Sequence, residues 1–226
     1  MSDTEANGTT NKAMAVKVGE NYRGLLYDFT DNGSTVKDDC TTTKSSYREP
    51  DVVTDYDTTN YSSAGYSSLE EMKQGLQSEY DKMITSVSKY YGFYIGRYEL
   101  GLDGSSNPTS KKAGNGITTA DASNSETEMW YGLYTKCKEY APEEGTKSVV
   151  SSMTWGSQYD AMMNWMQKNG IKVNTKGNNN IDITTGTSET DLLKNIYDLY
   201  GCHFEWTSEI YSTDRRDARR WHLWWQ

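Results

Sequence analysis

The stretch Asn195-Ile-Tyr-Asp-Leu-Tyr-Gly-Cys-His-Phe-Glu-Trp-Thr-Ser-Glu-Ile-Tyr-Ser-Thr-Asp214 decides the fold of this chain. Its first part is typical of a helical turn, because Ile196 and Leu199 are apolar at helical spacing and Gly201 can end the turn. From Phe204 to Glu209, apolar or small residues alternate with polar ones as they do in a strand. The pattern therefore predicts a helical turn that leads into a strand.

The tail that follows is rich in arginine and large aromatic residues. Its members are Arg215, Arg216, Arg219, Arg220, Trp221, His222, Trp224 and Trp225. Arginine and tryptophan are enriched at the energetic centres of binding interfaces, so this composition predicts a contact surface. The alternative is that the three tryptophans close the core as a last strand. The sequence leaves both interpretations open.

A second informative stretch lies in the first half of the chain. The capping box Ser68-x-x-Glu71 opens a run of apolar residues at spacings of three and four, which predicts an amphipathic helix that ends at Gly92. These residues are Leu69, Met72, Leu76, Tyr80, Met83, Val87 and Tyr90. The run Gly92-Phe-Tyr-Ile-Gly-Arg-Tyr-Glu99 follows and predicts a strand, in which Gly96 permits another backbone to come close.

Both stretches resemble a known family. Ile196-Tyr-Asp-Leu-x-Gly201 followed by Glu205-Trp-Thr207 is similar to the Ile-Tyr-Asp-Leu-Ala-Gly-Asn-Val-Trp-Glu-Trp-Thr segment of formylglycine-generating-enzyme-like proteins. The run from Gly92 to Glu99 resembles a second signature of that family, in the family order, and Ser151 to Met166 resembles a third segment. The resemblance implies an α+β C-type lectin fold with small antiparallel sheets and two or three flanking helices.

The departures from the family pattern cluster near the C-terminus. Tyr200, Cys202, His203 and Phe204 stand where the family has Ala, Asn, Val and Trp, and Arg219-Arg-Trp221 stands where it has Arg-Gly-Gly. Such departures resemble the variable proteins of diversity-generating retroelements, in which adenine-directed mutagenesis rewrites a C-terminal stretch. The resemblance implies a hypervariable ligand-binding region at about 199–226, and we expect these contact residues: Tyr200, Cys202, His203, Phe204, Arg215, Arg216, Asp217, Arg219, Arg220, Trp221, His222, Trp224 and Trp225.

The same comparison argues against catalysis. Formylglycine-generating enzymes use a late cysteine pair, whereas this chain has no cysteine after Cys202, and its other two cysteines show no metal-ligand spacing. The family's calcium-binding segment would retain only Glu205, since Cys202 and His203 replace its Asn and Val. No serine and carboxylate stand near either histidine at a spacing that suggests a triad. We therefore expect a non-enzymatic binding protein with no cofactor and no metal.

Three alternatives to a variable binder remain. One is a formylglycine-generating-type oxidoreductase, and another is a lectin-like module of fixed specificity. The third is a single-strand nucleic-acid contact through the arginine and tryptophan tail. The net charge of −9 argues against general nucleic-acid binding. The resemblance implies a protein or glycan ligand on a host or neighbouring cell surface, and a protein carried on a phage virion or held at a cell surface by association.

Length and composition predict one domain. With 226 residues, of which 35% are hydrophobic, we expect a single domain at 21–226 after a flexible segment at 1–20. The first residues show neither the basic nor the apolar region of a signal peptide, and no run of eighteen apolar residues exists, so without association we expect a cytoplasmic protein with no membrane span.

The remaining elements follow from periodicity and breaker residues. We expect a strand at Tyr22–Phe29, a helix from Ser125 to Pro142, a short strand at Val149–Met153 and a helix at Thr154–Lys168. Loops are expected at Cys40–Gly65, Leu102–Ser125 and Asn174–Thr190, the last with a brief strand at Ile181–Ile183.

Overall fold

The computed structural model describes residues 13–17, 50–53, 55–111, 115–116, 129–141, 149–168, 186, 196–197, 205–212 and 215–219. For residues 13–17, 115–116, 129, 160, 163–164, 166–168, 205, 211–212 and 215–219, the description covers the backbone. The predictions for Tyr22–Phe29, for the start of the second helix at Ser125 and for Ile181–Ile183 lie outside these ranges.

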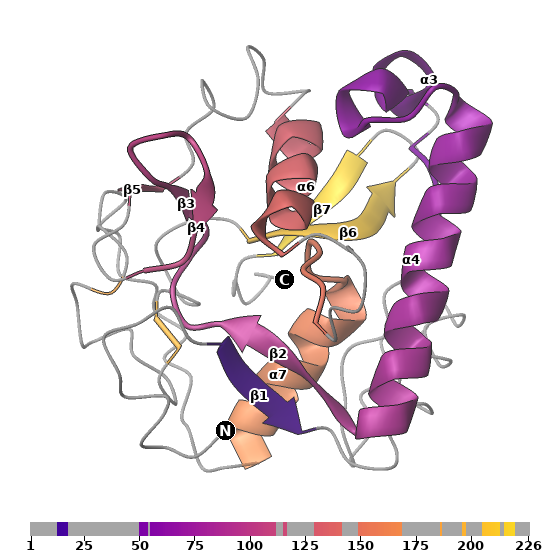
Figure 1. Ribbon diagram of the computed structural model, residues 1–226. Coiled ribbons are helices and arrows are strands. Elements are labelled where there is room, and N and C mark those ends of the chain that lie inside the picture. The colour runs from indigo at the N-terminus through magenta and orange to yellow at the C-terminus, as the bar shows by residue number, and fades with distance from the viewer. Residues whose placement is uncertain are drawn as a thin grey trace, which may run out of the picture.

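Three helices form the frame of the described structure: α4 (Leu69–Tyr90), α6 (Met129–Tyr140) and α7 (Gly156–Lys168). The long helix α4 runs along one side of the molecule, and α6 and α7 lie beside it (Figure 1). All three were predicted from sequence, although α7 begins two residues later than expected. Gln158 explains this later start, because its side-chain oxygen accepts the N–H of Trp155 at 3.1 Å and so caps the helix from inside its first turn.

The strands pair antiparallel in three small sheets. Their members are β1 (Ala13–Lys17) with β2 (Gly92–Gly96), β3 (Gly101–Leu102) between β4 (Pro108–Thr109) and β5 (Asn115–Gly116), and β6 (Glu205–Ser212) with β7 (Arg215–Arg219). The β3–β5 sheet lies on the opposite side of the molecule from α4 (Figure 1). Helices and small antiparallel sheets together confirm the α+β class.

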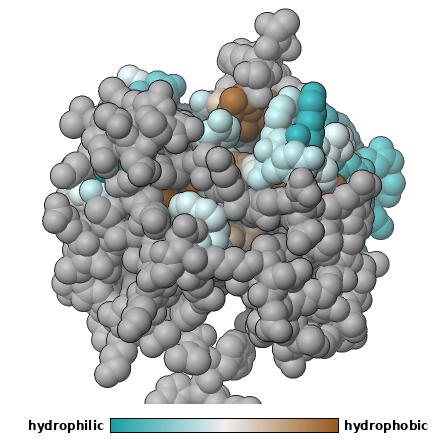
Figure 2. Space-filling view, turned by 90° about the horizontal axis from the view of Figure 1, so that it is seen from below, coloured by the Kyte–Doolittle hydropathy of each residue, from teal (hydrophilic) through white to brown (hydrophobic). Residues whose placement is uncertain are grey.

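The core lies between the inner face of α4 and the aromatic residues of α6. On α4, the helical period correctly selected Met72, Leu76, Tyr80, Met83 and Val87, which are buried. Ile84 is buried as well, although it was not among the predicted residues, whereas the predicted Leu69 is only partly buried and Tyr90 is exposed. Trp130, Tyr131 and Tyr134 of α6 pack against them, together with Trp155, whose ring meets that of Tyr80 edge to face at 5.1 Å. Seen from below, the hydrophobic residues among those described appear as small separate areas (Figure 2).

The start of α4 confirms the predicted capping box with one difference. Ser68 Oγ accepts the N–H of Glu71 at 3.1 Å, as a cap should. The Glu71 carboxylate reaches past the cap and accepts the N–H of Ser67 at 2.8 Å. Two N–H groups near the helix start are thus satisfied.

α4 ends at Tyr90, two residues before the predicted glycine, Gly92. Tyr91 is the C-cap and adopts a left-handed conformation with φ of 56°, while its N–H donates to the carbonyl of Val87 at 2.7 Å. A bulky residue with positive φ carries a steric cost that glycine avoids. Tyr91 is half exposed, at 50%, so little packing offsets that cost.

We predict that Tyr91→Gly raises the free energy of unfolding by about 0.5–1 kcal/mol, because relief of the left-handed strain exceeds the added freedom of the unfolded chain. Tyr90→Gly is the matched control, since Tyr90 is also exposed but lies within the helix. That change should cost about 1 kcal/mol. Urea unfolding of both variants checks the pair, and a destabilised Tyr91→Gly would contradict the prediction.

Several segments differ from the sequence-based expectation. Part of the expected flexible lead, Ala13–Lys17, forms β1 along β2. The expected loop at Cys40–Gly65 contains the short helix α3 (Asp57–Asn60) and the 3-10 turn η2 (Tyr61–Ala64). The buried carboxylate of Asp57 explains α3, because it accepts the N–H of Val53 at 2.6 Å and the hydroxyl of Tyr131.

Three further expectations are corrected. The expected loop from Leu102 holds β4 and β5, which pair with β3. Val149–Met153 is not a strand, because Ser151 bonds instead to the end of α6, donating its N–H to Ala141 and its hydroxyl to the Cys137 carbonyl. Ile196, expected in a helical turn, lies in a β-bridge.

Of the helices in the described part of the chain, none combines the length and the apolar character needed to cross a bilayer.

Candidate functional site

The two motifs that carry the family resemblance meet in space. The N–H of Tyr197 donates to the carbonyl of Arg97 at 2.9 Å, and the rings of Tyr98 and Tyr197 stack with centroids 5.1 Å apart. The guanidinium carbon of Arg97 lies 5.4 and 5.5 Å from these two ring centroids, within cation–π range. Burial raises the pKa of Tyr98 although Arg97 opposes the shift. The segment after β2 therefore fixes the chain just before the predicted binding region.

Three consecutive polar residues in the middle of β6 are buried. Thr207 and Glu209 are fully buried and Ser208 is nearly so, while Trp206 packs partly buried against the core. The sequence pattern predicted one face toward the core, but burial is continuous from Thr207 to Ile210. A strand with both faces covered needs hydrogen-bond partners for its polar groups. The alternating sequence pattern did not indicate that both faces of β6 are covered.

Two backbone contacts anchor β6 to the helical part of the molecule. The indole Nε1 of Trp130 donates to the Thr207 carbonyl at 2.8 Å, and the N–H of Ser208 donates to the Thr154 carbonyl at 3.0 Å. Trp130 belongs to α6, and Thr154 precedes α7. The two contacts tie β6 to both helices.

The register between β6 and β7 is irregular. Trp206 pairs with Ala218 and Ile210 pairs with Arg216, so Thr207, Ser208 and Glu209 lie opposite Asp217 alone. A second irregularity follows before Ser212, which pairs with Arg215. Such bulges bend a strand and increase its twist, and they are frequent beside functional sites, where they redirect side chains.

The structure brings four predicted contact residues together on one strand. Arg215, Arg216, Asp217 and Arg219 are consecutive or near neighbours along β7, and Arg219 is the register partner of Glu205. The start of the tail is therefore a strand paired with β6. The other nine predicted contact residues lie outside the described residues: Tyr200, Cys202, His203, Phe204, Arg220, Trp221, His222, Trp224 and Trp225.

Compared with family models, curated proteins and solved structures, the chain shows no match. Within the described ranges, no three histidine, cysteine, aspartate or glutamate side chains gather as they would around a metal ion. The candidate site is therefore a strand held firmly by the core, with a strand of charged sequence beside it.

A polar cluster that was not predicted from the sequence joins α4 to α6. Glu79 Oε1 accepts the Tyr134 hydroxyl at 2.7 Å and the Lys138 ammonium at 2.6 Å, and the Tyr66 hydroxyl lies 2.7 Å from that of Tyr134. These four residues are called the tyrosine–lysine cluster below. The only sequence signal for this cluster is that Tyr134 and Lys138 are four residues apart, so they lie on the same face of a helix.

The electrostatics of the tyrosine–lysine cluster favour its protonated form. Burial and the charge of Glu79 raise the pKa of Tyr134, and burial raises that of Tyr66. Burial alone would lower the pKa of Lys138, but its hydrogen bond and attraction to Glu79 raise it. A raised folded pKa contributes stability that is complete below the unfolded pKa and is lost as the pH rises.

We predict that Tyr134→Phe costs about 1–2 kcal/mol at neutral pH, through the lost hydrogen bond to Glu79, and that this difference from the wild type shrinks as the pH rises from about 9 to 11. Urea unfolding at several pH values measures the two curves. Tyr140→Phe, at an exposed position at the end of α6, is the control and should follow the wild-type curve. A constant difference between Tyr134→Phe and the wild type would contradict the assignment.

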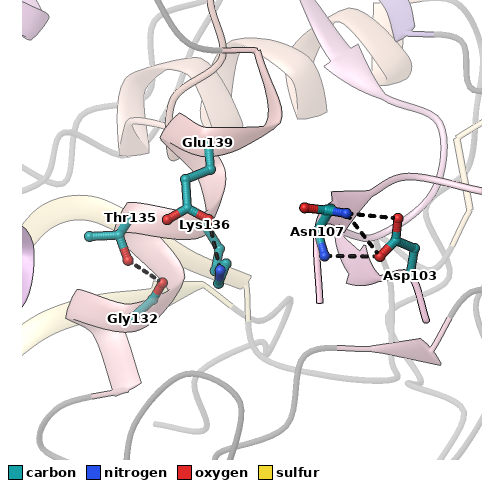
Figure 3. Close-up of polar contacts among 6 residues, drawn as sticks. All are labelled: Asp103, Asn107, Gly132, Thr135, Lys136 and Glu139. Atoms are coloured by element: carbon teal, nitrogen blue, oxygen red, sulfur yellow. Dashed lines mark hydrogen bonds and ion pairs between the residues drawn. The ribbon is translucent and has the colours of Figure 1, made fainter. Parts of the chain in front are cut away.

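Other polar contacts are local and stabilise turns. Asp103 Oδ1 accepts the N–H group of Asn107 at 2.9 Å in the turn between β3 and β4 (Figure 3). It also accepts the N–H of Ser105 at 2.8 Å. These bonds hold the pKa of Asp103 below its usual range. Ser106 in the same turn has φ of 63°, so we assign the contacts to turn formation.

Proposed function

We propose that the protein binds a ligand without performing chemistry, through a variable surface that starts on β7 and continues through the tail to Gln226. The observation that carries this proposal is the contrast between the two strands of one ribbon. In β6, the residues from Thr207 to Ile210 are buried, and the strand is anchored to α6 and to the segment just before α7, whereas β7 consists of arginine, aspartate and alanine. A rigid element that supports a changeable one is what a variable binding site requires.

The irregular register between β6 and β7 supports this division into an anchored strand and a variable strand. Because Thr207, Ser208 and Glu209 oppose Asp217 alone, β7 is not forced to follow β6 residue by residue. Substitutions on β7 then leave the anchoring contacts of β6 unchanged. The contact between Arg97 and Tyr197 adds support, since it joins the two motifs on which the C-type lectin resemblance rests.

The ligand that fits this chemistry is a protein or glycan with exposed acidic groups. The arginines can donate paired hydrogen bonds to carboxylates, and the tail tryptophans offer rigid aromatic area at low entropic cost. We place the ligand on a host or neighbouring cell surface, and the protein on a virion or at a cell surface by association. Hypervariability of the tail is part of the same proposal.

The variable part of the proposal has a direct test in DNA. We expect a reverse transcriptase gene near the gene for this protein, and a near-copy of the codons for Leu199–Gln226 that differs only at adenines. Sequencing the surrounding locus decides this. If neither is present, the tail is a site of fixed specificity, and the retroelement proposal fails while a lectin-like binding module remains.

The tolerance of the two strands provides a test that needs no ligand. We predict that a display library randomised at Arg215, Arg216, Asp217 and Arg219 stays largely folded, whereas one randomised at Thr207, Ser208 and Glu209 loses most folded members, since unpaired buried polar groups each cost about 1–3 kcal/mol. Protease resistance on the display surface measures folding. Equal tolerance of the two libraries would contradict the division into scaffold and variable strand.

A further inference from the structure

The ammonium group of Lys138 lies against two aromatic faces and one carboxylate. Its Nζ is 4.8 Å from the ring centroid of Tyr134 and 5.6 Å from that of Tyr66, both within cation–π range. Glu79 accepts its hydrogen bond at 2.6 Å. Two π faces with one carboxylate are the combination that selects an alkylammonium ion, because the rings favour a cation that has shed water and the carboxylate balances its charge.

A glycine in α4 allows the Tyr66 ring to come close to the helix backbone. A Cβ atom at Gly75 would stand 2.5 Å from Cε1 of Tyr66, so only glycine allows the Tyr66 ring to lie against the helix. Glycine within a helix costs about 1 kcal/mol relative to alanine. The contact between the Tyr66 ring and α4 therefore requires a glycine that lowers the helix propensity of α4.

The second ring is fixed by the core. Tyr134 is fully buried and stacks on Trp130 with centroids 4.9 Å apart. Glu79 is partly exposed, at 23%, and Lys138 more so, at 40%. The cluster is therefore held in place by the buried Tyr134 and the partly buried Tyr66 and Glu79, and it opens toward solvent along the lysine side chain.

We propose that Tyr66, Glu79 and Tyr134 form a binding site for an alkylammonium ion, which the chain fills with its own Lys138. The site is independent of the tail and of the proposed ligand-binding surface. Its ligand class follows from its donors: a primary or methylated amine, such as the side chain of a lysine, with one positive charge and a small alkyl group.

Lys138→Ala empties the site, and methylammonium chloride is the probe. In that variant, we expect about 0.1 M methylammonium chloride to raise the Tm by about 3–5 °C over the same concentration of sodium chloride, as a Kd near 10 mM would give. Wild-type protein, in which Lys138 occupies the site, should show no such difference. Glu79→Gln added to Lys138→Ala should abolish the response.

Lys136→Ala is the matched control on the same helix. Lys136 pairs with Glu139 at 2.7 Å, but this ion pair lies within α6 and does not reach α4 (Figure 3). This variant should respond equally to both salts. The proposal is overturned if Lys138→Ala shows no preference for methylammonium, or if Lys136→Ala shows the same preference.

A spectroscopic measurement keeps the proposal testable if Lys138→Ala does not fold. In the wild-type protein, the ring currents of Tyr66 and Tyr134 should shift the Lys138 Hε protons upfield of those of Lys136. The shift should diminish in Tyr66→Leu. Hε protons of Lys138 that resonate with those of Lys136 would show that no aromatic site holds the ammonium, and would overturn the proposal.

Discussion

The indole of Trp130 is the contact on which the rest of the structure depends. Its ring is buried, stacks on Tyr134 and meets Tyr131 edge to face at 5.2 Å. Its N–H is also the donor that satisfies the carbonyl of Thr207 in β6. One side chain therefore joins the core, the tyrosine–lysine cluster and the strand beneath the proposed binding surface. Few residues other than tryptophan could do this, because the position needs both a large apolar face and a single donor at its edge.

Burying a polar strand imposes a constraint of its own. Thr207, Ser208 and Glu209 would destabilise the fold if their backbone groups lost water without finding partners. Trp130 and Thr154 supply partners from outside the sheet, which releases β6 from strict pairing with β7. The bulge is thus a consequence of where the hydrogen bonds of β6 go. Under the proposed function, this separation of anchoring from pairing would let β7 change without disturbing the contacts of β6.

The parts of the fold that the sequence predicted are those governed by local rules. The cap at Ser68 and the apolar period of α4 depend on residues three or four apart, so both could be identified without knowing the rest of the chain. β1 could not be identified, because Ala13–Lys17 becomes a strand only through pairing with β2, far away in sequence. The tyrosine–lysine cluster could not be predicted for the same reason, because Tyr66 and Glu79 reach Lys138 only once α4 and α6 have packed together. For the candidate site, composition singled out the arginine-rich tail, but the register that sets Asp217 opposite three buried residues is a tertiary property.

The two proposed sites differ in how strongly a substitution in them would affect the stability of the fold, and this difference follows from their positions. The tyrosine–lysine cluster is built from the faces of α4 and α6 that also form the core, so a change in it is transmitted to Trp130 through the stacked ring of Tyr134. The strand β7 pairs with β6. The hydrogen bond that anchors β6 comes from Trp130 of α6 and does not involve β7. A chain that must keep its fold while one surface changes needs that surface at the periphery of its hydrogen-bond network. By this argument, variation is compatible with β7 and the tail, and incompatible with the tyrosine–lysine cluster, where each group depends on the exact partner that another helix supplies.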